Sequence, residues 1–186
     1  MRFPDCWGDR PAVMGVINLT PDSFSDGGRF NRLDLALNEA SRQLLQGAQV
    51  LDLGAQSTRP GARDVGADEE IARLLPSLEN IRAKHPQAIL SVDTFLAPVA
   101  RAALDAGADW INDVSGGRRD PAMLRLVADR GCPYVLMHSR GDSRSMDDCT
   151  DYGDQGVVAG VLQELRLSSD RAVRAGLRRE QLIWDP

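Results

Sequence analysis

Polar side chains stand at the ends of six short apolar runs in this sequence, and their types suit the binding of a small molecule. They are Asn18, Asp52, Asp93, the pair Asn112 and Asp113, His138, and Asp185. Singly, an Asp or Asn after a strand often caps the next helix or closes a turn. If all six ends meet around one opening, here called the mouth, their carboxylates, carboxamides and imidazole form a pocket for a ligand rich in hydrogen-bond donors.

The connection after the second run has the composition of an anion site. It reads Gly54-Ala55-Gln56-Ser57-Thr58-Arg59-Pro60-Gly61-Ala62. Glycines let backbone N–H groups approach a ligand closely, and an arginine fork can grip phosphate oxygens. The alternative is an exposed Arg59 that forms a salt bridge with Asp64.

The connection after the first run, residues 18–28, is long, mostly small and polar, and has Phe24 in its middle. A loop of this kind predicts a mobile lid over a site. The alternative is a solvated loop whose Phe24 tucks back onto the body of the protein.

Apolar runs of strand length alternate with segments of helical period along the whole chain. Runs this short, without polar alternation, suit strands buried on both faces, as in a parallel sheet. The predicted strands are 12–17, 50–53, 89–92, 110–111, 134–137 and 182–184. Apolar stripes and termination signals predict helices over 33–44, 71–81, 97–106 and 157–175. A further helix is predicted with Asp120 as N-cap, Pro121 at its first position and Gly131 after its end.

Five consecutive strand-then-helix units with short connections imply parallel strands joined by right-handed crossovers. Two α/β architectures fit this order. An open doubly wound sheet of six strands is complete at 186 residues, whereas a closed eight-stranded barrel typically needs about 250. Length alone favours the open sheet. In either case the working surface lies at the carboxyl ends of the strands.

The overall composition is mildly acidic, and the sequence contains no long run of basic residues. The net charge is -5 and the pI is near 5.0, which argues against a nucleic-acid or anionic-membrane surface. Cys6, Cys132 and Cys149 are odd in number and widely spaced, which favours free thiols in a reducing compartment. No apolar stretch has the length of a signal-peptide core or of a ~20-residue membrane span. We expect a cytoplasmic protein that binds neither nucleic acid nor membrane.

Six motifs, in this order and at these spacings, resemble the dihydropteroate synthase family. They are MGVINLTPDSFSDGG (14–28), STRPGA (57–62), SVDT (91–94), IND (111–113), LMH (136–138) and WDP (184–186). The first two are the specific ones. The resemblance implies a TIM-type (β/α)8 barrel, represented here by about six βα units, which reverses the preference drawn from length. It also implies the condensation of 6-hydroxymethyl-7,8-dihydropterin diphosphate with p-aminobenzoate in folate biosynthesis, with Mg²⁺ as cofactor and sensitivity to sulfonamides.

The resemblance also assigns roles to individual residues. Asp93, Asn112 and Asp185 would hold the pterin ring, and Asn18 would contact Mg²⁺ and the diphosphate. Thr58 and Arg59 would act near the leaving group, and Asp26 would face the cationic carbon. The loop residues Phe24, Pro60 and Ser57 would shape the sites for aminobenzoate and diphosphate.

The sequence departs from the family pattern at two places. Gln56 stands where many relatives carry glutamate, which removes one charge near the second loop. The family continues after the closing Asp-Pro with a glycine-rich loop and two more strands, which carry a lysine, an arginine and a histidine. We therefore expect residues 1–186 to form a single pterin-binding barrel domain that lacks its last two strands and helices and is by itself impaired or inactive. We expect the longer parent to be the active transferase and a homodimer. Two alternatives stay open: an inactive pterin-binding fragment and a methyltetrahydrofolate-type methyltransferase.

Overall fold

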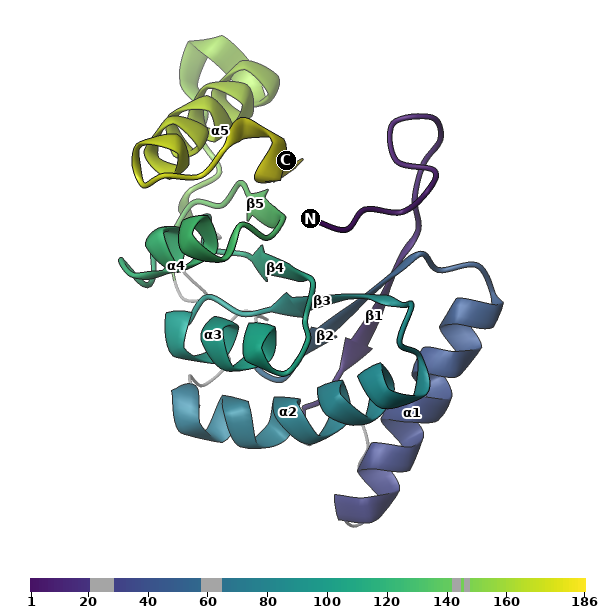
Figure 1. Cartoon of the computed structure of the whole chain (residues 1–186). Helices are drawn as coiled ribbons and strands as arrows, with labels where there is room; N and C mark the ends of the chain where they lie inside the picture. The colour runs from purple at the N-terminus through teal and green to yellow at the C-terminus, as the bar shows by residue number, and fades with distance from the viewer. Residues whose placement is uncertain (21–28, 58–64, 142–144, 146–147) are drawn as a thin grey trace.

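Six parallel strands alternate with five α-helices in the part of the chain that the structure describes (Figure 1). The structure, a computed structural model, describes residues 1–20, 29–57, 65–141, 145 and 148–186, and only the backbone of residues 29–32. The strands are β1 Met14–Asn18, β2 Val50–Gly54, β3 Ile89–Asp93, β4 Trp110–Asp113, β5 Tyr134–Met137 and β6 Leu182–Asp185. The helices are α1 Arg29–Leu45, α2 Ala67–Lys84, α3 Ala97–Asp105, α4 Met123–Arg130 and α5 Gly156–Arg174, with 3-10 turns at Gly153–Gln155 and Arg179–Gln181. None of these helices is both long enough and apolar enough to cross a membrane.

The strands lie in the sheet in the order in which they occur in the chain, and every neighbouring pair is parallel. A doubly wound sheet reverses its strand order at a switch point. Within the described residues each new strand is instead added beside the one before it, without a reversal. The doubly wound architecture that length favours is therefore wrong, and the winding is that of a (β/α)8 barrel. β1 and β6 form the two edges of the sheet, so these six strands do not close a barrel.

Apolar strand residues pack on both faces of the sheet, as expected for parallel strands. On the outer face, residues such as Leu53 and Val92 join the helices in the main core. On the inner face, the intervening residues form a second apolar cluster at the amino ends of the strands. This inner cluster consists of Val50, Ile89, Trp110 and Val135. Because alternate side chains of a strand point to opposite faces, the two clusters fix which residues of each strand face inward.

The amino-terminal segment covers the inner cluster. Phe3 and Trp7 lie against Trp110, with ring centroids 5.6 Å and 5.5 Å from the Trp110 ring. The Trp110 indole N–H donates to the Arg2 carbonyl at 2.7 Å. Apolar side chains therefore fill the inner face at the amino ends of the strands, and its polar residues lie toward the carboxyl ends.

The predicted end of α4 is confirmed, but its predicted start is wrong. The helix is followed by Gly131, whose φ of 66° is left-handed. It begins at Met123, two residues later than predicted. The carboxylate of Asp120 accepts hydrogen bonds from the backbone N–H of Ala122 at 2.9 Å and of Ala97 at 2.8 Å. Asp120 therefore closes a turn before α4 and caps the first turn of the neighbouring helix α3.

A side chain from α1 caps the free edge of β1. β1 bonds to β2 through alternate residues, so the carbonyl of Val16 points toward the free edge. Gln43 donates through Nε2 to this carbonyl at 3.0 Å and to Glu39 at 2.7 Å. A Cβ on Gly15 would overlap the amide oxygen of Gln43. The absence of a side chain at position 15 therefore makes room for the cap.

We predict that Gly15→Ala destabilises the protein by about 1 kcal/mol, because it displaces the Gln43 amide from its hydrogen bonds. Urea unfolding followed by circular dichroism measures the change. In a Gln43→Ala background the same substitution should cost nothing, since the added methyl group meets no amide and alanine loses less backbone entropy than glycine. Equal costs in the two backgrounds would contradict the proposed cap.

Candidate functional site

Five of the predicted strand-end residues share the inner face of the sheet. They are Asn18, Asp52, Asp93, Asn112 and Asp185. Asn18, Gly54 and Asp93 are register partners across β1, β2 and β3, and Asp93 is in turn the partner of Asn112 on β4. Asp52 lies one layer deeper, two residues before Gly54. The structure thus brings these side chains to one mouth at the carboxyl ends of the strands.

Gly54 leaves a space between the side chains of Asn18 and Asp93. A Cβ on Gly54 would lie 3.4 Å from Asp93 Oδ2 and 3.9 Å from Asn18 Oδ1. Both oxygens therefore border the same small volume at the end of β2. A side chain at position 54 would occupy part of that volume, and glycine is the residue that keeps it open.

Asp52 and Asn112 form a hydrogen-bonded pair beneath the mouth. Asn112 donates through Nδ2 to Asp52 Oδ2 at 3.0 Å. Only 4% of the Asp52 surface is exposed. Burial raises the pKa of the Asp52 carboxyl, and it outweighs the lowering by the neighbouring Ser91 and Asn112. Desolvation is therefore the dominant effect on this carboxyl.

The pKa of the Asp93 carboxyl is raised as well. Burial raises its pKa to about 8, and the negative charges of Asp52, Glu70 and Asp113 add to the rise. A carboxyl with this pKa is largely protonated at neutral pH. Buried carboxyls whose pKa is shifted by specific neighbours are concentrated at binding and catalytic sites.

Three buried oxygens around the mouth lack a hydrogen-bond partner among the described residues. They are Asp52 Oδ1, Asp93 Oδ1 and Asn112 Oδ1. A buried acceptor without a donor costs free energy, which is why native proteins contain few of them. All three are acceptors when the carboxyls are ionised. The site is therefore complementary to a small molecule that presents several N–H donors.

Asp113 lies next to Asn112 in the sequence but points to the outer face. It is buried and accepts hydrogen bonds from the backbone N–H of Ser115 at 2.7 Å and of Gly117 at 3.0 Å. It also accepts from the Tyr134 hydroxyl at 2.7 Å, and burial together with the Asp113 charge raises the pKa of that hydroxyl. Asp113 therefore holds the turn after β4 and is not part of the mouth.

His138 also points away from the mouth. Its Nε2 lies 2.9 Å from Glu164 Oε2 on α5. Glu164 pairs with Arg140 as well, and the Arg140 guanidinium lies 3.7 Å from the centre of the Tyr152 ring. The prediction that all six strand ends supply one mouth is therefore wrong for His138, which ties the end of β5 to its covering helix.

Five predicted site residues lie outside the residues that the structure describes. They are Phe24, Asp26, Thr58, Arg59 and Pro60. Ser57 is described: it is half-buried and follows the buried Gln56, just beyond the end of β2. Roles for the loop residues therefore remain predictions from the resemblance.

Two residues near the mouth, Ser91 and Glu70, were given no role by the sequence argument. Ser91 lies on the inner face, and the period of two along β3 could have indicated it. Glu70, on the first turn of α2, is 1% exposed and adds to the rise in the pKa of Asp93. No sequence signal marks it, because it ends the acidic run Asp68-Glu69-Glu70, which is typical of an exposed helix start.

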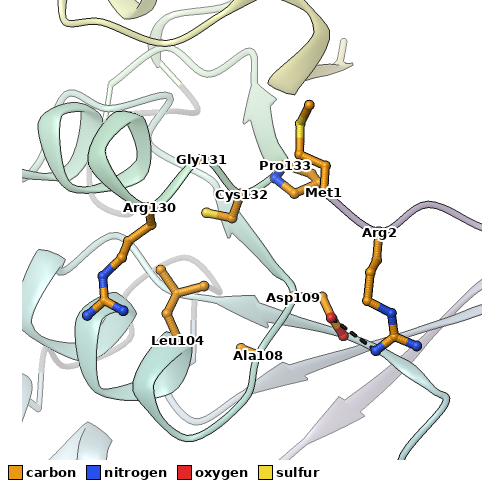
Figure 2. Close-up of a pocket in the computed structure, with 9 residues that line it drawn as sticks. All are labelled: Met1, Arg2, Leu104, Ala108, Asp109, Arg130, Gly131, Cys132 and Pro133. Atoms are coloured by element: carbon orange, nitrogen blue, oxygen red, sulfur yellow. Dashed lines mark hydrogen bonds and ion pairs between the residues drawn. The ribbon is translucent and has the colours of Figure 1, made fainter.

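A cavity of about 250 Å³ lies at the opposite end of the sheet (Figure 2). Its walls include Asp109 and Pro133, which directly precede β4 and β5. Figure 2 shows Arg2 and Arg130 on opposite sides of it, with Arg2 paired to Asp109 at 3.2 Å. Because barrel enzymes place their chemistry at the carboxyl ends of the strands, we assign the functional site to the mouth and not to this cavity.

Comparison with known proteins shows the family of this chain. The model of the family described as "Pterin binding enzyme" matches residues 14–186. The chain belongs to the pterin-binding enzyme family. It is 44% identical over 180 residues to the dihydropteroate synthase of Synechocystis sp., and 42% identical over 178 residues to that of Bacillus subtilis. These alignments cover 97% and 96% of this chain, but 61% and 59% of the relatives, so the chain spans about three fifths of their length.

Solved structures of dihydropteroate synthases share the fold. The Xanthomonas albilineans enzyme with 4-aminobenzoic acid superposes with a TM-score of 0.86 at 44% identity, over 98% of this chain and 65% of that one. The Yersinia pestis enzyme in a sulfonamide drug complex gives a TM-score of 0.85 at 41% identity, over 95% and 63%. The predicted TIM-type barrel, represented by six βα units, is thereby confirmed.

We predict that Asp93 makes the protein less stable as the pH rises from 3.8 to about 8. Its folded-state pKa of about 8 lies above the ordinary value of 3.8, so its favourable contribution is complete below 3.8 and is lost as the pH rises through 8. Asp93→Asn, which is neutral and of the same shape, should flatten this dependence and exceed the wild type in stability above pH 8. Thermal unfolding at pH 5 to 9 measures both, with the exposed Asp154→Asn as control. Parallel profiles for wild type and Asp93→Asn would show that Asp93 is ionised in the folded protein throughout.

Proposed function

We propose that the protein carries out the dihydropteroate synthase reaction of folate biosynthesis. The arylamine nitrogen of p-aminobenzoate forms a bond to the methylene carbon of 6-hydroxymethyl-7,8-dihydropterin diphosphate. The bond from that carbon to diphosphate breaks, a proton leaves the nitrogen, and 7,8-dihydropteroate results. The observation that carries the proposal is the layer of buried acceptors formed by Asp52, Asp93 and Asn112. The relatives, which are named dihydropteroate synthases, support it.

The acceptors suit the aminopyrimidinone edge of a pterin, which presents adjacent N–H donors. An ionised carboxylate can accept two such donors side by side, and Asp93 and Asp185 with Asn112 supply the oxygens. A ligand without these donors would leave buried oxygens unpaired, which a polar site penalises strongly. Donors from the ligand also favour the ionised form of Asp93, so binding below pH 8 should release a proton.

Mg²⁺ belongs to the same proposal, with Asn18 as the protein ligand. The amide oxygen of Asn18 and a carboxylate oxygen of Asp93 border the space beside Gly54, and oxygen donors of this kind suit Mg²⁺. No group of three His, Cys, Asp or Glu residues in the described segments is arranged to hold a metal. The ion would therefore take most of its ligands from the diphosphate and water, as Mg²⁺ commonly does. Bound there, it would stabilise the negative charge that develops on the leaving diphosphate.

The two loops supply the remaining proposed roles, which rest on the resemblance alone. Thr58 and Arg59 would contact the leaving diphosphate, where a guanidinium stabilises developing negative charge. Asp26 would face the positive charge on the pterin methylene carbon. The aminobenzoate and diphosphate sites would be shaped by Phe24, Pro60 and Ser57.

The wider setting is part of the same proposal. Cys6, Cys132 and Cys149 are free thiols in the structure, which suits a reducing cytoplasm. The single pterin-binding domain, and a homodimer for the longer protein, remain predictions. Sulfonamide binding is proposed from the likeness to the Yersinia pestis enzyme, whose structure contains such a drug.

We predict that Asp93→Asn weakens the binding of 6-hydroxymethylpterin about tenfold or more, because the substitution replaces a carboxylate oxygen with an N–H donor that faces the donors of the ring. Isothermal titration calorimetry measures the affinity. Arg59→Ala is the matched contrast: it should slow turnover while the affinity for the pterin ring changes little. An unchanged pterin affinity in Asp93→Asn would remove Asp93 from the site.

A second candidate function is a pterin-binding module without turnover. It is favoured by one observation: β6 is an edge of the described sheet and Asp185 at its end is exposed, so the mouth is open on that side. A methyltetrahydrofolate-type methyltransferase is disfavoured, because the relatives are named for dihydropteroate synthesis.

Turnover separates the two candidates. We expect residues 1–186 to release diphosphate from the pterin substrate slowly or not at all, because the lysine, arginine and histidine that the resemblance places on two further strands are absent from them. Any release should depend on p-aminobenzoate, because the arylamine is the nucleophile. An enzyme-coupled diphosphate assay with and without p-aminobenzoate measures this. Pterin binding without any release would favour the module, and the absence of both would refute the pterin site itself.

A further inference from the structure

The carboxamide of Asn112 has one end that donates and one end that accepts, and its direction decides what the mouth offers a ligand. Its Nδ2 donates to Asp52 Oδ2 at 3.0 Å. Its Oδ1 has no hydrogen-bond partner among the described residues. The amide therefore turns its donor toward β2 and leaves its acceptor for the site.

Asp52 imposes this direction by its chemistry. Asp52 Oδ2 accepts the hydrogen bond from Asn112 Nδ2, and an oxygen that accepts there without a hydrogen of its own cannot bond to Asn112 Oδ1. The Nδ2 end of the amide therefore faces Asp52 and the Oδ1 end faces away. Asp52 is 4% exposed and lies one layer beneath the register partners Gly54 and Asp93. Its burial leaves little water to compete with Asn112 for its Oδ2. The two ends of the amide have nearly the same shape, so its hydrogen bond to Asp52 is what distinguishes them.

We propose that Asp52 is a positioning residue that sets the hydrogen-bond specificity of the mouth through Asn112. It holds the Asn112 carboxamide with Oδ1 toward the ligand, so that the site selects a heterocycle that presents an N–H donor there. This inference rests on the proposed pterin site and gives Asp52, already part of the acceptor layer, a further role that it exerts on the ligand through another side chain.

Asp52→Asn removes the constraint on the orientation of the Asn112 amide but keeps the shape of the side chain at position 52. An asparagine at position 52 can accept from Asn112 Nδ2 or donate to Asn112 Oδ1, so both orientations of the Asn112 amide become populated. In the second orientation an NH₂ group faces the donors of a pterin and suits an acceptor instead. Affinity for a donor-bearing ring should fall, and affinity for its acceptor-bearing counterpart should rise.

A matched pair of ligands tests the exchange. 6-Hydroxymethylpterin and 6-hydroxymethyllumazine differ in having an amino group or a carbonyl at ring position 2. We expect the ratio of their affinities, measured by calorimetry on the 186-residue chain, to fall about tenfold in Asp52→Asn, because one buried donor–acceptor match is lost. Ser91→Ala removes a hydroxyl beside Asp52 but leaves the Asp52 carboxyl in place to accept from Asn112 Nδ2, so its ratio should stay within about twofold of the wild type. An unchanged ratio in Asp52→Asn, or an equal fall in Ser91→Ala, overturns the inference.

A ligand-free measurement separates this inference from the proposed function. In wild-type protein the side-chain NH₂ signals of Asn112, identified by their loss in Asn112→Asp, should form one set whose bonded hydrogen exchanges slowly with solvent. In Asp52→Asn they should shift and exchange faster. If wild-type protein binds neither ligand but shows these signals, the proposed function fails and the positioning role stands. If pterin binds and the Asn112 hydrogens exchange as fast as those of an exposed amide, the positioning role fails alone.

Discussion

The site depends on the register between parallel strands, and the apolar layer beneath the mouth holds that register. Trp110 and Ile89 on the inner face lie directly below the polar layer, under the cover of the amino-terminal segment. A slip of one residue between two strands would exchange the inner and outer faces of one of them. It would move Asp93 into the helix-covered core and Val92 into the mouth. Burial of the apolar residues therefore determines where the carboxylates point.

Holding the Asp52 and Asp93 carboxyls close together at the mouth costs free energy in the ligand-free protein. The buried Asp52 lies close enough to the half-buried Asp93 that its charge raises the pKa of Asp93, and desolvation raises the pKa of both. Two carboxyls in this position do not stabilise the fold, and a pair of apolar side chains would pack there at lower cost. Hydrogen-bond donors from a ligand remove part of that cost, so the unfavourable burial in the free protein becomes selectivity in the complex.

The sequence predicts the helices and strands well, but it misplaces the ends of strands whose last residues are polar. The strand 134–137 has its predicted bounds, and each of the other five ends one or two residues later than predicted. All the added residues except Gly54 are polar, among them Asn18, Asp93 and Asp113. An argument based on apolar runs therefore places them outside the strands. Once they are inside the strand, alternation fixes their direction. That is why Asn112 enters the mouth and Asp113 cannot. Chain length misled the choice of architecture, because it assumes that the fold is complete in these residues.

At the end of β4, two consecutive residues have different roles: one faces the ligand side of the sheet, and the next holds the following turn. Asn112 faces the ligand side, whereas Asp113 receives two backbone N–H groups and a tyrosine hydroxyl on the outer side. The turn that Asp113 holds brings Gly116 so close to β5 that a Cβ there would lie 2.8 Å from the Met137 carbonyl. At β5 the outward His138 similarly binds Glu164 of α5. The outward polar groups anchor the loops, whereas the inward side chains of Asp52, Asp93 and Asn112 each keep one oxygen without a partner among the described residues. A parallel strand provides both kinds of residue because its side chains alternate.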